Sequence, residues 1–250
     1  MKFVRVQHQE KTSWGVLEGE IVRTLEHAPF DGISFDGGYL PLSDCRLLAP
    51  CEPSKIVLVG KNYYDHALEM NDGIPEYPIL FMKGANALNH PEGEIHAPDF
   101  VQRLDYEGEL AIVIGTRAKN LTPENAQEYI WGFTCLNDVT ARDIQSADGQ
   151  WTRAKSMDGF APIGPWITDE TDGADLKIET RLNGNTVQSS RTSMFMTKIP
   201  EMLSFITASM TLEPGDVVST GTPAGIGPML PGDIIEVEIE SIGILRNHIV

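Results

Sequence analysis

The sequence has few cysteines, no long apolar segment and no recognisable leader. Its three cysteines, Cys45, Cys51 and Cys135, form no CxxC pair and no even framework, which indicates a reducing compartment and argues against a disulfide scaffold. No uninterrupted apolar run approaches the roughly 18–20 residues that a membrane-spanning helix requires. The segment from Met1 to Lys11 lacks the apolar core of a signal peptide. We therefore expect a cytoplasmic protein without a membrane span.

Basic residues are also scarce: 19 Lys and Arg against 36 Asp and Glu give a formal net charge of −17. A surface this acidic repels phosphate backbones and anionic lipid, so neither nucleic-acid nor membrane partners are expected. It also repels carboxylic acids, so a site for such a substrate needs local positive charge from a bound cation or from placed Lys and Arg residues. With 250 residues, 41% of them hydrophobic, the chain can build a large core.

Strand and turn signals predict a mainly β fold with a few helices (α+β), and no alternating βαβ pattern. A small N-terminal β-rich unit is expected over residues 1–50, followed by a metal-binding catalytic domain over residues 51–250. The stretch Gly73–Pro98 is rich in Gly and Pro and is predicted to be mostly loop, suited to a mobile lid. The predicted strands lie at Met1–Val6, Trp14–Leu17, Lys55–Gly60, Ile79–Met82, Glu109–Ile114, Trp131–Leu136, Leu176–Leu182, Asp216–Ser219 and Ile234–Ile239. The predicted helices lie at Pro123–Tyr129 and Ile199–Met210, with helical character at Asn62–Met70.

Two glutamates stand at the start of a predicted buried strand, in the segment DYEGELAIVIG at positions 105–115. Alternate residues of a strand point to the same face, so Glu107 and Glu109 project side by side. The residues that follow are apolar almost without a break, so the two carboxylates repel each other and are costly to desolvate. A hard divalent cation relieves both problems. A solvated strand edge is the alternative for an isolated Glu-x-Glu.

A third carboxylate, Asp138, follows the strand predicted at Trp131–Leu136 and precedes a short helix-like segment, Arg142–Gln145. Asp138 fits the N-cap of that helix. Capping does not explain Arg142 and Gln145, which fall on roughly one helical face with it. A carboxylate beside a forked guanidinium suits a site for a metal-bound carboxylic acid.

His66 and Glu69 are three residues apart in the segment with helical character, so their side chains meet on a helix surface. A histidine that a carboxylate orients is a general base that can activate water. The alternative is an exposed ion pair, which is common on protein surfaces.

Three further residues are candidates for substrate contact. Lys155 suits the stabilisation of a developing enolate and Lys83 the binding of a carboxylate, although exposed surface is the ordinary place for a lysine. Thr222 lies in the Gly-rich segment STGTPAGIG, whose backbone N–H groups and hydroxyl suit a carboxylate. The segment lacks the Lys-Ser/Thr of a P-loop, and a Gly-rich turn without a ligand stays an alternative.

Taken together, these segments resemble the fumarylacetoacetate hydrolase family. The matching motifs, in order, are GKNYxDHxxEM at 60–70, DYEGEL at 105–110, NDVTARD at 137–143, KS at 155–156 and TGTP at 220–223. The likeness runs from about Lys55 to the C-terminus. The first 50 residues look like the variable N-terminal unit found in part of that family.

The resemblance implies a mixed β-roll, a homodimer and a bound Mg²⁺ or Mn²⁺. It implies metal ligands at Glu107, Glu109 and Asp138, an acid–base pair at His66 and Glu69, and substrate contacts at Arg142, Gln145, Lys155 and Thr222. Lys83 matches a family lysine, but Gly84 departs from the proline often found after it. Asn86 and His90 fall in a divergent loop that is expected to border the pocket, which leaves the substrate open.

Family members of this kind act on 2-oxo acids through a metal-chelated enolate. Hydrolysis of the C–C bond of an acylpyruvate is favoured narrowly. The alternatives are decarboxylation of oxaloacetate, and isomerisation or decarboxylation of a 2-hydroxyhepta-2,4-diene-1,7-dioate-type intermediate of aromatic catabolism. The alternative to an enzyme is a non-catalytic protein that binds the metal and a keto acid. It is disfavoured because the sequence keeps all three metal ligands and the His-Glu pair.

Overall fold

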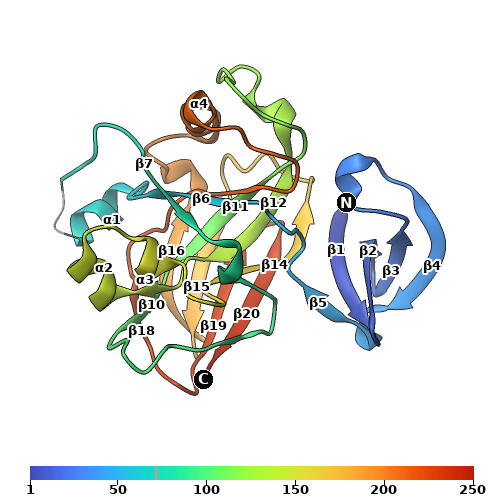
Figure 1. The fold of residues 1–250 in the computed structure, drawn as a ribbon, viewed down its shortest axis with the longest axis horizontal. Coiled ribbons are helices and arrows are strands. Elements are labelled where there is room, and N and C mark those ends of the chain that lie inside the picture. Colours follow the sequence, from blue (N-terminus) through green and yellow to red (C-terminus); the bar gives the residue numbers. More distant parts are fainter. Residues whose placement is uncertain (71–72) are drawn as a thin grey trace.

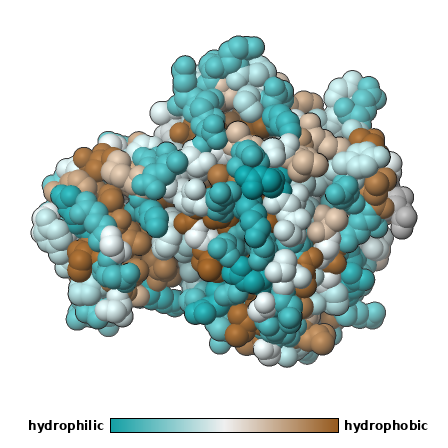
Figure 2. Space-filling view, turned by 180° about the vertical axis from the view of Figure 1, so that it is seen from behind, coloured by the Kyte–Doolittle hydropathy of each residue, from teal (hydrophilic) through white to brown (hydrophobic). Residues whose placement is uncertain are grey.

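The computed structural model describes residues 1–70 and 73–250. Over these residues the chain forms three β-sheets with four α-helices packed around them (Figure 1). The predicted α+β class is confirmed. On the face seen from behind, hydrophilic residues are interspersed with small hydrophobic patches, as expected for so acidic a chain (Figure 2).

The N-terminal strands form a meander, drawn in blue in Figure 1. Strands β1 to β4 pair antiparallel in chain order, and β5 pairs with β1. Lys2 and Phe3 of β1 also pair with β14, so the meander continues the large sheet of the rest of the chain. A boundary near residue 50 therefore stays a prediction. The strands are β1 (Lys2–His8), β2 (Lys11–Glu18), β3 (Ile21–Leu25), β4 (Phe35–Pro41) and β5 (Arg46–Leu48).

The large sheet continues in the order β14-β12-β11-β17-β6-β7, with the short strand β8 beside β14. Strand β11 is buried on both faces: Leu110 and Ile112 pack into one apolar cluster, while Ala111 and Val113 pack into another. The near-continuous apolar run therefore lies in the sheet interior, as predicted. The strands are β6 (Ile56–Gly60), β7 (Ile79–Lys83), β8 (Leu88–Asn89), β11 (Gly108–Ile114), β12 (Ile130–Asn137), β14 (Ala161–Thr168) and β17 (Val217–Ser219).

Two smaller sheets complete the fold. The five-stranded sheet shares an apolar cluster with β11 through side chains such as Ile178, Val237 and Leu245. Pro-Gly-Asp turns precede β17 and β19, as the sequence predicts. The five-stranded order is β16 (Asn185–Arg191), β15 (Lys177–Leu182), β19 (Ile234–Ile239), β20 (Gly243–Ile249) and β9 (Glu94–Ile95); the three-stranded order is β13 (Thr140–Ala141), β10 (Leu104–Tyr106) and β18 (Gly227–Met229).

The helices are short except for α4, which buries Ile199, Met202 and Ile206 along one face. Among the described residues, none of the helices has the length and apolar character needed to cross a membrane. The helices are α1 (Tyr64–Glu69), α2 (Arg142–Asp148), α3 (Thr152–Lys155) and α4 (Ile199–Ser209).

One expectation about local structure needs correction. The predicted helix Pro123–Tyr129 is only a 3₁₀ turn, Ala126–Tyr129, because the Gly115 N–H donates to the Tyr129 carbonyl at 2.8 Å and draws the chain into β12. The stretch Gly73–Pro98 is mostly loop, as predicted, with the predicted strand present as β7 and two further short strands, β8 and β9, which pair with β14 and β20. A mobile lid in this stretch stays a prediction.

Candidate metal centre and acid–base site

Three carboxylates meet where β10, β11 and β12 end or begin. Glu107 lies between β10 and β11, Glu109 is the second residue of β11, and Asp138 directly follows β12. All three are buried, and one oxygen of each lies within 4.8 Å of the others. Glu107 therefore lies just before the strand β11, yet its side chain still joins that of Glu109, as expected. Asp138 is not an N-cap, because α2 begins after Ala141.

Hydrogen bonds fix the backbone at Glu107, where the chain leaves β10 and has not yet entered β11. The Glu107 N–H donates to the side-chain oxygen of Asn137 at 3.0 Å. The Asp138 N–H donates to the Glu107 carbonyl at 2.8 Å. The register of β11 and β12, in which Gly108 faces Asn137, places these residues side by side. Two of the carboxylates are thus fixed by the sheet that carries them.

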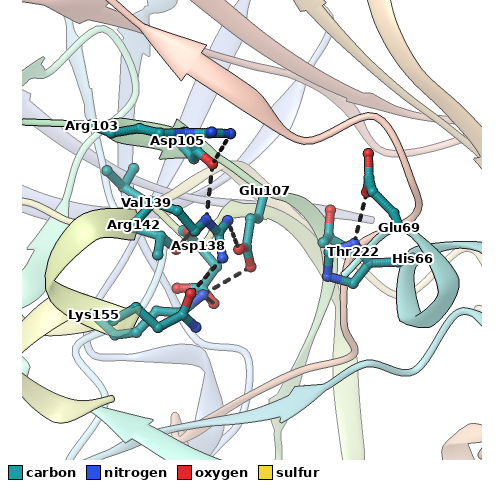
Figure 3. A network of polar contacts seen from close by, with 12 residues as sticks. His66, Glu69, Arg103, Asp105, Glu107, Asp138, Val139, Arg142, Lys155 and Thr222 are labelled. Atoms are coloured by element: carbon teal, nitrogen blue, oxygen red, sulfur yellow. Dashed lines mark hydrogen bonds and ion pairs between the residues drawn. The ribbon is translucent and has the colours of Figure 1, made fainter. Parts of the chain in front are cut away.

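Cations neutralise two of the three carboxylates (Figure 3). Lys155 Nζ lies 2.9 Å from Glu107 Oε2 and 2.6 Å from Asp138 Oδ2. Arg142 forms an ion pair with the other oxygen of Glu107. Burial acts to raise the pKa of Glu107, but Lys155 and Arg142 outweigh it and hold that pKa well below its usual range. Burial acts to lower the pKa of Lys155, but Asp138 and Glu107 hold it above the ordinary value.

Glu109 is different, because its contacts are neutral. Its Oε2 accepts hydrogen bonds from Ser219 Oγ at 2.5 Å and from the Gly221 N–H at 3.0 Å. Among the residues that the structure describes, no basic side chain forms an ion pair with it. Burial, followed by the charges of Asp138 and Glu107, raises the pKa of Glu109 well above its ordinary value. Glu109 is therefore the one carboxylate of the three without an ion pair among the described residues, and an all-oxygen donor set suits a hard divalent cation.

A cavity of about 370 Å³ opens onto this centre. Of the ten residues singled out in the sequence, seven line it: His66, Glu107, Glu109, Arg142, Gln145, Lys155 and Thr222. Glu69, Lys83 and Asp138 are not among the lining residues, although each contacts one of them or their partners. The cavity thus places the carboxylate centre, a buried lysine and a histidine around one space.

His66 projects from α1 into this cavity and is only 5% exposed. Its Nδ1 lies 3.1 Å from Glu69 Oε2 (Figure 3). The Gly225 N–H in turn donates to Glu69 Oε1 at 3.0 Å, which holds the carboxylate in place. His66 therefore does not belong to an exposed surface pair. With Nδ1 engaged, Nε2 is the nitrogen left for proton transfer.

Lys83 does not reach the cavity. Its Nζ is fully buried, 2.8 Å from Asp138 Oδ1, and it donates to the carbonyls of Val139, Lys155 and Phe160 at 2.8, 2.6 and 2.6 Å. Burial lowers the pKa of Lys83 to about 8. The expectation that Lys83 contacts a substrate carboxylate is therefore wrong. This lysine instead connects Asp138 to the end of α3.

Two other substrate-contact candidates are held by protein groups at the cavity wall. Thr222 Oγ1 donates to the Gly108 carbonyl at 2.9 Å and accepts from Gln188 Nε2 at 2.8 Å. Gln145 accepts from Arg142 Nη1 at 2.6 Å. Both residues line the cavity, so contact with a bound molecule is open to each of them.

The divergent loop does not border the cavity, contrary to expectation. Asn86 Nδ2 donates to the Ser156 carbonyl at 2.8 Å, and His90 Nδ1 accepts the Ala49 N–H at 3.0 Å. Neither residue is among those that line the cavity. Their difference from the family pattern therefore carries no information about the substrate.

Sequence reasoning missed Asp105, which is fully buried and fixes Arg142. Arg142 Nε donates to Asp105 Oδ2 at 2.9 Å, and Arg103 Nε donates to Asp105 Oδ1 at 2.8 Å. The signal was present: Asp105, Glu107 and Glu109 occupy alternate positions, but only the last two were singled out. The aromatic residues of the cavity, Phe81 and Trp151, carried no comparable signal.

Fold and site together define a protein with a buried cluster of three carboxylates that could hold a metal ion, beside a His-Glu pair. A family model described as "Fumarylacetoacetate (FAA) hydrolase C-terminal" matches residues 55–250, and a model described as "Rv2993c-like, N-terminal" matches residues 1–50. The chain belongs to the fumarylacetoacetate hydrolase family, as the sequence motifs indicated.

Similar proteins bear the names of several activities. The chain is 40% identical over 224 residues to the bovine (Bos taurus) protein named oxaloacetate tautomerase FAHD2A, mitochondrial, covering 84% of this chain and 71% of that one. It is 40% identical to the solved structure of 5-carboxymethyl-2-hydroxymuconate delta-isomerase from Mycobacterium smegmatis, with a TM-score of 0.95 over 100% of this chain and 99% of that one. It is 39% identical to the solved fumarylacetoacetate hydrolase of Exiguobacterium antarcticum, with a TM-score of 0.90 over 100% and 99% of the chains.

Proposed function

We propose that this protein is a divalent-metal-dependent enzyme that moves a proton at the carbon next to the keto group of small 2-oxo acids, as a tautomerase or isomerase. One observation carries the proposal: His66, oriented by Glu69 at 3.1 Å, shares a cavity with the three-carboxylate centre. Acid–base transfer of this kind needs one positioned base and a way to stabilise the resulting negative charge. The cavity offers both.

The metal centre would be held by Glu107, Glu109 and Asp138, whose carboxylate oxygens suit Mg²⁺ or Mn²⁺. When bound, such a cation supplies the positive charge that draws electrons from a keto group and its neighbouring carboxylate. The lack of an ion pair at Glu109 supports this assignment, because a bound divalent cation would offset both the burial and the charges of Asp138 and Glu107 that raise its pKa.

His66 accepts or delivers the proton through Nε2, while Glu69 holds Nδ1 and fixes the orientation of the ring. Lys155 lines the same cavity, and its ammonium stabilises negative charge on the substrate. Arg142 is held by Asp105 and Glu107 and presents its guanidinium at the cavity wall. These residues bind and orient a small anion that the acidic surface would otherwise repel.

Hydrolysis of an acylpyruvate, which the motifs favoured, is the second candidate. The same His66 Nε2 can take the proton of a water that attacks the carbonyl, and the similarity to the Exiguobacterium antarcticum hydrolase supports it. Tautomerisation is placed first because it needs no ordered water, and because two of the three similar proteins above are named for proton-transfer reactions. Decarboxylation of oxaloacetate would need the cation and Lys155, but no base.

The test compares wild type with His66→Ala on three reactions with Mg²⁺ or Mn²⁺: ketonisation of enol-oxaloacetate, hydrolysis of acetylpyruvate and decarboxylation of oxaloacetate. The matched control is His96→Ala, because His96 also pairs with a glutamate, Glu94 at 3.2 Å, but is exposed and away from the cavity. We expect ketonisation to fall by about 10²–10⁴-fold in His66→Ala only, as for a lost general base.

Each outcome points to one reaction. If wild type hydrolyses acetylpyruvate but shows no ketonisation, and His66→Ala loses the hydrolysis, the second candidate is favoured. Metal and oxalate binding without turnover of any substrate would indicate a binding protein. Equal activity in wild type and His66→Ala would remove His66 from the chemistry.

A further inference from the structure

One wall of the cavity is aromatic and lies beside the charged centre. Phe81 of β7 and Trp151, the residue before α3, both line the cavity, with ring centroids 5.1 Å apart in an edge-to-face arrangement. Lys155 Nζ, which contacts two of the carboxylates, is 5.1 Å from the centroid of Phe81. The aromatic wall therefore begins about one side chain away from the metal centre.

A glycine at position 60 allows the Trp151 ring to lie this close to strand β6. Gly60 is the last residue of β6, and a Cβ placed on it would lie 2.9 Å from Cζ3 and 3.3 Å from Cη2 of Trp151. The indole thus occupies space that any other side chain at position 60 would need. Glycine within a strand commonly marks such a close approach. Because Phe81 also packs against the indole, the ring has little freedom to retreat.

We propose that Gly60, Phe81 and Trp151 determine which substituent the 2-oxo acid carries. This inference rests on the proposed function, since it assumes that the keto-acid head lies at the carboxylate centre. The substituent then extends along the rings, which offer carbon surface and favour a flat group. The cavity of about 370 Å³ is at the small end of ligand sites, so the substituent is also short.

Two cations of the cavity serve the other end of the substrate. Arg142 is paired with Asp105 and Glu107, and Lys155 with Glu107 and Asp138, so both belong to the carboxylate centre. Lys61 and Met70 also line the cavity, and the aromatic wall is the part of it that offers flat carbon surface to a substituent. The class of substrate inferred is a 2-oxo acid with a flat unsaturated or small aryl substituent.

The experiment uses two non-reactive mimics of 2-oxo acids, oxamate and N-phenyloxamate, which share a head and differ in the substituent. Their binding to the Mn²⁺-loaded protein is measured by calorimetry for wild type, Gly60→Ala, Trp151→Ala and Gly73→Ala. Gly73→Ala is the matched control, because a Cβ at Gly73 would meet no atom of the described residues within 4 Å. Circular dichroism of each variant verifies the fold.

In Gly60→Ala, N-phenyloxamate should bind about tenfold more weakly or worse, as expected for one extra methyl in a tight pocket, while oxamate is little changed. Trp151→Ala should weaken N-phenyloxamate as well, through loss of the ring contact, and admit bulkier N-naphthyloxamate that wild type rejects. Equal weakening of both mimics in Gly60→Ala would overturn the inference alone. Failure of wild type to bind either mimic would overturn the proposed function together with it.

Discussion

Replacing Glu109 by Gln should change stability and metal affinity in opposite directions. Glu109 is 2% exposed and has hydroxyl and backbone N–H partners but no ion pair among the described residues. Two unit charges 4.8 Å apart, the limit that bounds this cluster, repel by about 3.5 kcal/mol at an effective dielectric constant of 20. Lys155 and Arg142 offset part of that repulsion at the neighbouring carboxylates. We therefore expect the metal-free Glu109→Gln protein to be more stable by about 1–3 kcal/mol.

The same change removes a charged ligand from a hard cation. We expect Mn²⁺ affinity to fall by about 100-fold, which corresponds to about 2.7 kcal/mol. Thermal unfolding in the presence of a chelator measures the first effect; a gain of about 2–4 °C per kcal/mol is the expected scale for a chain of this size. Calorimetric titration with Mn²⁺ measures the second effect.

Glu107→Gln is the matched control, because it alters a carboxylate of the same centre that does have cationic partners. Removing that charge leaves Lys155 and Arg142 partly uncompensated, so the metal-free variant should lose about 3–5 kcal/mol. Metal affinity should fall in both variants. If metal-free Glu109→Gln is destabilised as much as Glu107→Gln, then Glu109 is not the unneutralised charge of the centre and the reasoning is wrong.

Three further predictions concern residues outside the cavity. Lys83→Met should lower Mn²⁺ affinity by about 10–100-fold, because Lys83 positions Asp138 although it is not itself a ligand. An unchanged affinity in calorimetric titration would refute this role. Burial, followed by the charges of Arg46 and Arg5, lowers the pKa of His90 from 6.5, so the folded protein binds fewer protons than the unfolded one. The free energy of unfolding should therefore fall as the pH drops below about 6.5. Urea unfolding at about pH 5 and about pH 7.5 should show this loss in wild type and not in His90→Asn. Asp216→Asn should lower the free energy of unfolding by about 3–5 kcal/mol, because buried Asp216 accepts hydrogen bonds from the Ser54 and Glu213 N–H groups and pairs with Lys55. A decrease of less than about 1 kcal/mol in urea unfolding would contradict this.

The sequence was most informative where local geometry decides the outcome. Alternate residues share a face, so Glu107 and Glu109 were expected to meet, and they do although Glu107 lies just outside the strand. The helix Ile199–Met210 was predicted, and α4 covers all but its last residue, with a proline in the first turn and its apolar residues buried. Both features depend only on residues close together in the chain.

What the sequence did not predict depends on distant contacts. Lys83 was expected to reach a substrate, but it is held by Asp138, 55 positions away, and by three carbonyls. Pro123–Tyr129 has helix-forming residues, but the bond from Gly115 to Tyr129 ends the turn where β12 must begin. The aromatic wall needs Gly60, Phe81 and Trp151 from three separate segments, and no local pattern links them.

The most direct test of the central claim is exchange of the methyl protons of pyruvate in D₂O, followed by ¹H NMR with Mg²⁺. Exchange reports removal of a proton next to the keto group, whatever reaction follows it. We expect wild type and His96→Ala to catalyse exchange only when Mg²⁺ is present, and the rate to fall by about 10²–10⁴-fold in His66→Ala. Exchange that persists in His66→Ala, or in wild type treated with a chelator, would contradict the claim that the carboxylate centre and the His66-Glu69 pair act on one substrate.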